Sequence, residues 1–470
     1  MAWTINNGKL YFNTKLYTGN GASSHAISGA GFQPDLVWLK NRSDSTWHQL
    51  IDAVRGTGAA YTLASNSNEA EGGGSTNQYG FISALSSDGF TVSAGTSNAS
   101  VVNHNGNNYA SWNWIGAGTA PSNTYAVKVV SDGGNKYRFD DFGTSAVTLE
   151  ISEGGTFTFD QSDSSNNGHP LRFATQADAA NSSQYTTGVT TNGTPGQAGA
   201  YTRITVAASA PTLYYYCTAH SGMGGQANTP VTNSFSNFAG SIQSNISPNT
   251  TSGFSIVAYS GSSASSKTIG HGLSAVPKMI IVKCLSAAEN WAVYHHALGN
   301  THALFLNTNG ASSDTPVFAD TTPTSSVFSV SADDRSGADG KTYVAYVFAE
   351  KQGYSKFGSY VGNGNADGTF VYTGFKPAFV LLKHSSGGTD NWNLYDNKRL
   401  GYNANYSFLI PNESNAENTG ATTAPLDLLS NGFKIRASTG HSNSSGETYI
   451  YMAFAKNPFT SSAGTPVTAR

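Results

Sequence analysis

One string occurs three times along the chain, and it limits the folds that the chain can adopt. Each copy has a proline followed by a run of mostly apolar residues that ends in lysine, at residues 31–40, 275–283 and 374–383. Self-similarity at a fixed period indicates repeated structural units rather than one continuous domain. The signature prolines Pro277 and Pro377 lie 100 residues apart, which sets the length of one unit.

Each unit continues with the same kinds of segment after its proline. A tryptophan-centred segment comes next, and we expect Trp47, Trp291 and Trp392 to occupy equivalent positions. Large aromatic side chains dominate β-sandwich cores, so a core role is favoured over three sugar-stacking platforms. Each unit closes on a pair of strand-like segments, at residues 89–92 with 108–114, 327–330 with 342–348, and 432–435 with 448–454.

The first two units are separated by an insertion. Pro34 and Pro277 lie 243 residues apart, about 143 more than one period, and a loop of that length is uncommon inside a compact domain. The insertion is therefore predicted to be a domain, and segments 116–123 and 228–252 have the composition of linkers. The predicted division is 1–118 for the first unit, 122–228 for the insertion, 250–351 for the second unit and 354–460 for the third.

The residue pattern favours an all-β protein. Glycine contributes 52 of 470 residues, and short aromatic and β-branched runs are separated by Gly, Ser, Thr and Asn. Residues 278–282 are continuously apolar, as in a strand buried on both faces. We expect several antiparallel β-sandwich domains in series, jelly-roll or lectin-like. A β-propeller is the alternative, but three units of about 100 residues are too few and too long for its blades.

Composition also bears on function. The net charge is −3 and only 11% of residues are charged, which argues against a nucleic-acid binder. No stretch approaches the 18 apolar residues of a membrane span, so membrane insertion is not expected. Two cysteines cannot form a disulfide framework.

No pattern of catalytic residues is recognisable, and we expect no enzyme activity. Adjacent acids such as Glu69 with Glu71, or Asp333 with Asp334, are typical of solvated turns rather than of a glycosidase. His295 and His296, with His302 nearby, could hold a metal, but the run lacks the supporting carboxylates usual for zinc, and a loop is the better interpretation.

The sharpest chemical signal lies in the insertion. His169 is followed 48 residues later by Cys217, His220 and Met223 in the run Cys-Thr-Ala-His-Ser-Gly-Met-Gly-Gly. A thiolate, two imidazoles and a thioether are a soft donor set. This set suits copper in a trigonal site with a weak axial ligand.

This arrangement resembles the cupredoxin family of small blue-copper β-sandwiches, and the resemblance covers roughly residues 122–228. Residues 150–159 also look like the strand that precedes the first ligand in that family. The resemblance implies His169, Cys217 and His220 as equatorial ligands, Met223 as the axial candidate and copper as the cofactor.

The spacing departs from the family pattern at the axial position. Relatives with Cys-x-x-His usually place the axial methionine about five residues after the histidine, where Gly225 stands here. Gln226 or a backbone carbonyl is the alternative axial ligand. The alternative for the whole domain is a spacer in which Cys217 is simply a packed core residue.

Strings at residues 17–21, 31–43, 52–56, 87–90 and 348–360 are similar to a module of virion proteins from marine tailed bacteriophages, including those of cyanobacteria. The resemblance implies a structural virion protein, made in the host cytoplasm, that acts in host attachment as a tail fibre, another appendage or a capsid decoration. Its expected partners are other virion proteins, further copies of itself in a homo-oligomer, and a host-surface glycan.

Two other functions are alternatives to the virion role. One is a copper protein of the cupredoxin type. The other is a stand-alone carbohydrate-binding protein, for which the loop residues Tyr79, Tyr402 and Tyr406 are the candidate contacts, because tyrosine among Ser, Gly and Asn is typical of binding loops.

Overall fold

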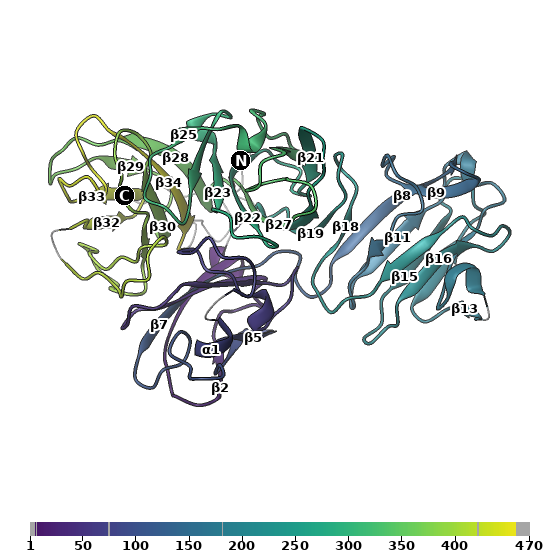
Figure 1. The fold of residues 1–470 in the computed structure, drawn as a ribbon, viewed down its shortest axis with the longest axis horizontal. Coiled ribbons are helices and arrows are strands. Elements are labelled where there is room, and N and C mark those ends of the chain that lie inside the picture. Colours follow the sequence, from purple (N-terminus) through teal and green to yellow (C-terminus); the bar gives the residue numbers. More distant parts are fainter. Residues whose placement is uncertain (1–4, 6, 74–75, 181, 421–422, 457–470) are drawn as a thin grey trace.

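The computed structural model describes residues 5, 7–73, 76–180, 182–420 and 423–456, and within them the chain is all-β (Figure 1). The outer ends of the first and last predicted domains, residues 1–4, 6 and 457–460, lie outside the described residues. No helix in the described ranges has the length and apolar character needed to cross a membrane. In the part of the chain that the structure describes, the helical elements are one short α-helix and six 3₁₀ turns: α1 (Thr76–Tyr79), η1 (Gly8–Leu10), η2 (Ala59–Tyr61), η3 (Ser164–Asn166), η4 (Ala177–Ala179), η5 (His296–Leu298) and η6 (Pro316–Phe318).

The first and third units have the same topology. Each packs a four-stranded antiparallel sheet against a three-stranded one, in the orders β1-β7-β3-β4 with β2-β6-β5, and β28-β34-β30-β31 with β29-β33-β32. The strands of the first unit are β1 (Phe12–Thr18), β2 (Ser24–Ser28), β3 (Leu36–Asn41), β4 (Gln49–Asp52), β5 (Phe81–Ser86), β6 (Gly89–Ser93) and β7 (Asn108–Trp114). Those of the third are β28 (Ser355–Val361), β29 (Phe370–Tyr372), β30 (Pro377–His384), β31 (Asn393–Asp396), β32 (Leu426–Leu429), β33 (Gly432–Ile435) and β34 (Thr448–Ala455).

The second unit contains the same order, β20-β27-β22-β23, inside an eight-stranded sheet, and a two-stranded sheet β21-β26 lies against it. Two of the added strands, β18 and β19, fall in the segment 228–252 that was expected to be a linker, so that expectation is wrong for residues 235–249. The strands are β18 (Phe235–Asn237), β19 (Ser244–Asn249), β20 (Phe254–Ser260), β21 (Ser266–Gly270), β22 (Pro277–Cys284), β23 (Ala292–His295), β24 (His302–Phe305), β25 (Ser313–Asp314), β26 (Val327–Ser331) and β27 (Thr342–Ala349).

The proline-led strands β3, β22 and β30 are buried on both faces, as the apolar run predicts. Alternate side chains of a strand point to opposite faces. In β22, Met279 and Ile281 join a core shared by all three units, while Ile280 and Val282 join a core shared by the second unit and the inserted domain. The three large sheets therefore pack around one common apolar core.

Polar contacts link the units in a cycle. Tyr346 of the second unit donates to Asp52 of the first, and Trp112 of the first donates to Asp396 of the third. The His295 ring of the second unit meets the backbone oxygen of Tyr451 in the third. Asp52, Asp396 and His295 are the last residues of the equivalent strands β4, β31 and β23, so each contact uses the same position of its unit. The three sandwiches form one group, with the insertion to one side (Figure 1).

The inserted domain consists of two five-stranded sheets, in the orders β14-β15-β11-β8-β9 and β10-β17-β16-β12-β13. Their strands are β8 (Ser122–Ser131), β9 (Asn135–Phe139), β10 (Leu149–Glu150), β11 (Thr156–Asp160), β12 (Leu171–Ala174), β13 (Gln184–Tyr185), β14 (Val189–Asn192), β15 (Tyr201–Thr205), β16 (Leu213–Cys217) and β17 (Gly225–Asn228).

The insertion is fastened to the first unit at one buried carboxylate. Asp35 accepts hydrogen bonds from the backbone of Gly116 (2.7 Å) and Gly118 (3.0 Å) on the outgoing connection. It also accepts one from the Asn233 amide (2.7 Å) on the returning connection. Both connections are therefore held by one side chain.

Candidate metal centre

The pairing of β12 with β16 brings the predicted ligands together. These strands are antiparallel with Leu171 opposite Cys217, so His169, two residues before β12 begins, lies beside the end of β16. The Thr218 backbone also donates to the Pro170 carbonyl (3.2 Å), which continues the pairing into the loop that carries His220. Residues 48 positions apart in sequence thus meet because of strand register.

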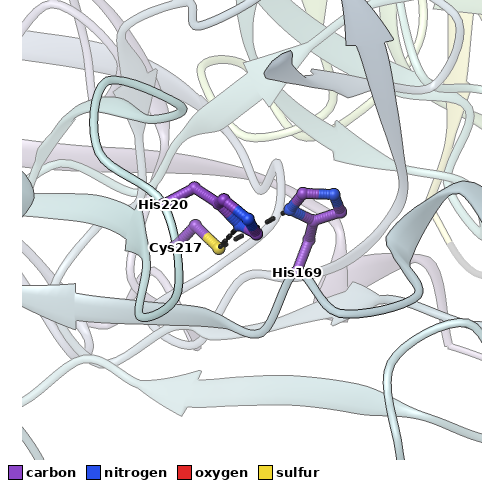
Figure 2. Close-up of side chains that lie close together, drawn as sticks. All are labelled: His169, Cys217 and His220. Atoms are coloured by element: carbon purple, nitrogen blue, oxygen red, sulfur yellow. Dashed lines mark hydrogen bonds between the residues drawn. The ribbon is translucent and has the colours of Figure 1, made fainter.

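His169, Cys217 and His220 form one compact group of donor atoms (Figure 2). The Cys217 Sγ lies 3.8 Å from His169 Nδ1 and 3.7 Å from His220 Nδ1, and one ligand atom from each residue falls within 4.8 Å of the others. The imidazole centroids are 4.6 Å apart. Cys217 is buried, His169 is half-buried and His220 is exposed, so the group opens to solvent on one side.

Buried polar side chains hold the His169 backbone in place. Its carbonyl accepts hydrogen bonds from the Tyr137 hydroxyl (2.9 Å) and the Gln161 amide (2.8 Å). Its N–H donates to the carbonyl of Asn166 (2.8 Å), whose own amide donates to the carbonyl of Val127 (2.7 Å). Supporting contacts of this kind orient ligands in metal sites.

The loop between β16 and β17 is held at Gly222. Its N–H donates to the Asp178 carboxylate (2.7 Å), and its carbonyl accepts from the Lys136 ammonium. The loop backbone also passes so close to β16 that a Cβ on Gly224 would lie 1.6 Å from the Tyr215 carbonyl. Glycine is therefore required at that position.

The structure separates the two axial candidates. Met223 is 1% exposed and belongs to the same apolar cluster as Cys217, and its role as axial ligand stays a prediction. Gln226 pairs with Tyr214, so it points to the face opposite Tyr215 and Cys217, and its amide donates to Asn228. The alternative that Gln226 is the axial ligand is wrong.

Electrostatics favour the ligand form of His169. Burial, and then the neighbouring His220, lower the pKa of His169, which favours the neutral imidazole that binds metals. Burial and then the proximity of Cys217 raise the pKa of Tyr137, so its hydroxyl stays a hydrogen-bond donor. A His₂Cys donor set in a partly enclosed site fits copper.

The remaining histidine and acidic candidates serve as structural contacts. The rings of His295 and His296 face the backbone oxygens of Tyr451 and Phe357, each at 3.2 Å. His302 contacts Thr301 instead of joining them. Among the candidate acids, those with ion-pair partners are Glu71 with Arg55, Asp333 with Arg335, and Asp334 with Lys341.

The expected equivalence of Trp47 with Trp291 and Trp392 is wrong by one residue. His48 directly precedes β4, as Trp291 precedes β23 and Trp392 precedes β31. The backbone N–H of all three donates to an asparagine side chain at 2.9 Å. His48 is buried and Trp47 is half-buried, so the core position of the first unit holds an imidazole.

The loop tyrosines do not form one surface. Tyr79 is half-buried against the first unit's core, whereas Tyr402 is 61% exposed and lies beside Tyr406 in the third unit. Sequence reasoning missed Tyr137 and Asp178 at the metal centre. Neither lies near a ligand in sequence, and no motif marks them.

Comparisons with known proteins bear on the scaffold. The chain matches the family described as "Domain of unknown function (DUF7483)" over residues 7–133 and 226–458. The unmatched segment between these ranges contains His169, Cys217 and His220. No curated protein and no solved structure matches the chain. Because the match flanks the insertion on both sides and covers well over half of the sequence, the chain belongs to the DUF7483 family.

Proposed function

We propose that the inserted domain binds a single copper ion through His169, Cys217 and His220. The observation that carries this proposal is the convergence of the three donors, with Sγ 3.8 and 3.7 Å from the two Nδ1 atoms. A cysteine retained only for packing would not need two imidazole nitrogens turned towards its sulfur. The His₂Cys set, with a buried methionine, Met223, three residues after His220, is the combination that suits copper.

Copper in such a site would supply one-electron transfer. The chain's own contribution is to hold the three donors with little freedom to move. Tyr137 and Gln161 fix the His169 carbonyl, and Asp178 and Lys136 fix the loop that follows His220. The exposed edge of His220 leaves one side of the centre accessible to a redox partner.

Titration of the full chain with Cu(II) under anaerobic conditions tests this proposal. We expect one equivalent to give an intense thiolate-to-copper band in the visible range. Cys217→Ser should abolish the band, and Cys284→Ser is the matched control because Cys284 is the other buried free cysteine and lies in the second unit. A colourless wild-type protein, or a band lost equally in both variants, would refute the proposal.

We also propose that the chain is a structural, non-enzymatic virion protein that carries the copper domain on a scaffold of three sandwiches. Support comes from the resemblance of the repeated strings to bacteriophage virion modules. The shared core and cyclic contacts add support, because they make a rigid body suited to presenting surfaces to a host. In this role its partners are other virion proteins, further copies of itself and a host-surface glycan.

Gold-labelled antibody against the chain, applied to phage particles and viewed by electron microscopy, tests the virion role. Label at the tail would support a host-recognition appendage, and label over the head a capsid decoration. Unlabelled particles in preparations where the antibody detects the purified chain would refute the virion role and leave the copper proposal standing.

A further inference from the structure

The outer face of the small sheet in the third unit carries two exposed aromatic side chains. Phe370 is 44% exposed and Tyr372 is 62% exposed, while Val371 between them is 6% exposed and packs in the core. Both aromatics therefore point to solvent from the same strand, β29. Large apolar side chains that share an exposed face often mark a binding surface.

Strand register places the neighbours of these aromatics. Phe370 is opposite Lys434 in β33, and Lys434 is opposite Asp427 in β32. Tyr372 is opposite Gly432, which is small enough for the Phe370 ring to lie against it: a Cβ there would be 3.1 Å from the Phe370 ring. The Phe370 ring thus lies over the sheet at Gly432, and its cross-strand neighbour is the charged Lys434.

The other two units show that the fold does not require aromatics at these positions. In the first unit, the register of β2 with β6 places Ala26 and Ser28 where the third unit has Phe370 and Tyr372. In the second unit, the register of β21 with β26 places Thr268 and Gly270 there. The equivalent pairs on this strand are therefore Ala26 and Ser28 in the first unit, Thr268 and Gly270 in the second, and Phe370 and Tyr372 in the third. A purely structural role would not explain why only the third unit bears aromatics.

The charged groups on this face neutralise one another. The Asp367 carboxylate lies 2.5 Å from the Lys434 ammonium and 3.2 Å from the Arg436 guanidinium. Arg436 also lies 3.3 Å from Asp427. Two cations and two carboxylates leave no net charge, so the face favours neither an anionic nor a cationic ligand, yet it presents many hydrogen-bonding groups.

We propose that this face, defined by Phe370, Tyr372, Lys434, Arg436 and Asp367, binds an uncharged saccharide. A sugar ring has an apolar C–H face that packs on an aromatic ring and a rim of hydroxyls that exchange hydrogen bonds with carboxylates, ammonium and guanidinium groups. A purely apolar partner would remove water from the charged side chains without offering hydrogen bonds in its place, which is unfavourable. A neutral ligand that is apolar on one face and hydroxylated at its rim matches both halves of the surface.

This inference does not depend on the copper centre. It rests on the attachment role proposed above, because it names the class of ligand that such a role would use. The two proposals are tested separately: electron microscopy of labelled particles tests the attachment role, and saccharide binding tests the face.

Affinity electrophoresis of the full chain provides the test, in native gels that contain one soluble neutral polysaccharide each: a mixed-linkage glucan, a galactomannan or a starch. We expect at least one polysaccharide to retard the wild-type chain and the double variant Phe370→Ala/Tyr372→Ala to lose at least tenfold in affinity. Ser28→Ala and Thr268→Ala are matched controls at equivalent positions and should be retarded like the wild type. Far-UV circular dichroism and the thermal midpoint establish that each variant is folded.

Three outcomes would overturn the inference. One is the absence of retardation in every gel. Another is retardation that survives in the folded double variant, which would place the saccharide site elsewhere, for example at Tyr402. The third is aggregation of wild type through β29 that the double variant abolishes without any saccharide effect, because the face would then serve strand pairing between copies.

Discussion

The Tyr346 hydroxyl donates a 2.9 Å hydrogen bond to the Asp52 carboxylate, although the two residues lie 294 positions apart and in different units. The same carboxylate is paired with the Arg55 guanidinium at 2.6 Å, and both side chains are almost fully buried. An equivalent set forms where Trp112 donates to Asp396, which pairs with Arg399. Buried ion pairs therefore sit where neighbouring units meet.

We predict that Asp52→Ala lowers the free energy of unfolding by about 3–5 kcal/mol, because it leaves the Arg55 charge buried without its main partner. Tyr346→Phe removes the hydrogen bond to Asp52 and a longer one that the hydroxyl accepts from Arg55 (3.4 Å), and it should cost about 1–2 kcal/mol. Urea denaturation followed by tryptophan fluorescence measures both. Lys128→Ala, which breaks an exposed pair with Asp141, is the control and should cost at most about 1 kcal/mol. A loss for Asp52→Ala no larger than the control would show that the junction contributes little.

Three buried lysines at equivalent strand ends predict a pH dependence of stability. Burial lowers the pKa of Lys40 to about 7 and of Lys283 and Lys383 to about 8. Each ammonium donates to backbone carbonyls, and Lys283 reaches the carbonyl of Asn68 in the neighbouring unit. Between these values and about 10.4, the unfolded chain binds more protons than the folded one, so stability rises with pH.

The free energy of unfolding should therefore increase from pH 7.5 to pH 9.5, and the increase should be smaller in Lys283→Met. Urea midpoints at the two pH values measure the slope, and exposed Lys456→Met is the control that should keep the wild-type slope. A slope unchanged in Lys283→Met would mean that this lysine is not desolvated in the folded chain.

The corrected register of the first unit gives another prediction. Trp291 is fully buried, and its indole N–H donates to the carbonyls of Ala64 and Ser67 in the first unit. Trp291→Ala should cost about 3–5 kcal/mol, whereas Trp47→Ala, at a half-buried position, should cost well under half of that. Thermal unfolding of the two variants compares them directly. Equal losses of stability in the two variants would instead support the equivalence of Trp47 with Trp291 that the sequence suggests.

The sequence predicted the features that depend on local patterns. Apolar runs such as 278–282 indicate strands buried on both faces, and Cys-x-x-His with a distant histidine indicates the candidate metal centre, whose three donors the structure brings together. The register error at Trp47 arose because two adjacent residues, Trp47 and His48, both satisfy a local alignment. The start of β4, the bond from the His48 N–H to Asn66 and the contact of the His48 ring with the Ile410 carbonyl of the third unit distinguish them. The shared core could not be predicted, because a continuous apolar run shows that a strand has two buried faces but not which sheet covers each face.

Tyr137 offers the most specific test of how the scaffold supports the metal centre. Its hydroxyl donates to the His169 carbonyl at 2.9 Å. Tyr125 of the same domain makes the same kind of bond, also at 2.9 Å, to the carbonyl of Ser236 in β18 of the second unit, and that bond involves no ligand residue. Tyr137→Phe and Tyr125→Phe should therefore lose similar stability, about 1 kcal/mol each. Only Tyr137→Phe should weaken copper binding, by about tenfold, and shift the visible band, because it removes one of the two hydrogen bonds that position the His169 carbonyl. Copper titration followed by absorbance separates the two effects: equal copper affinity and an unchanged band in both variants would show that Tyr137 stabilises the fold without positioning His169.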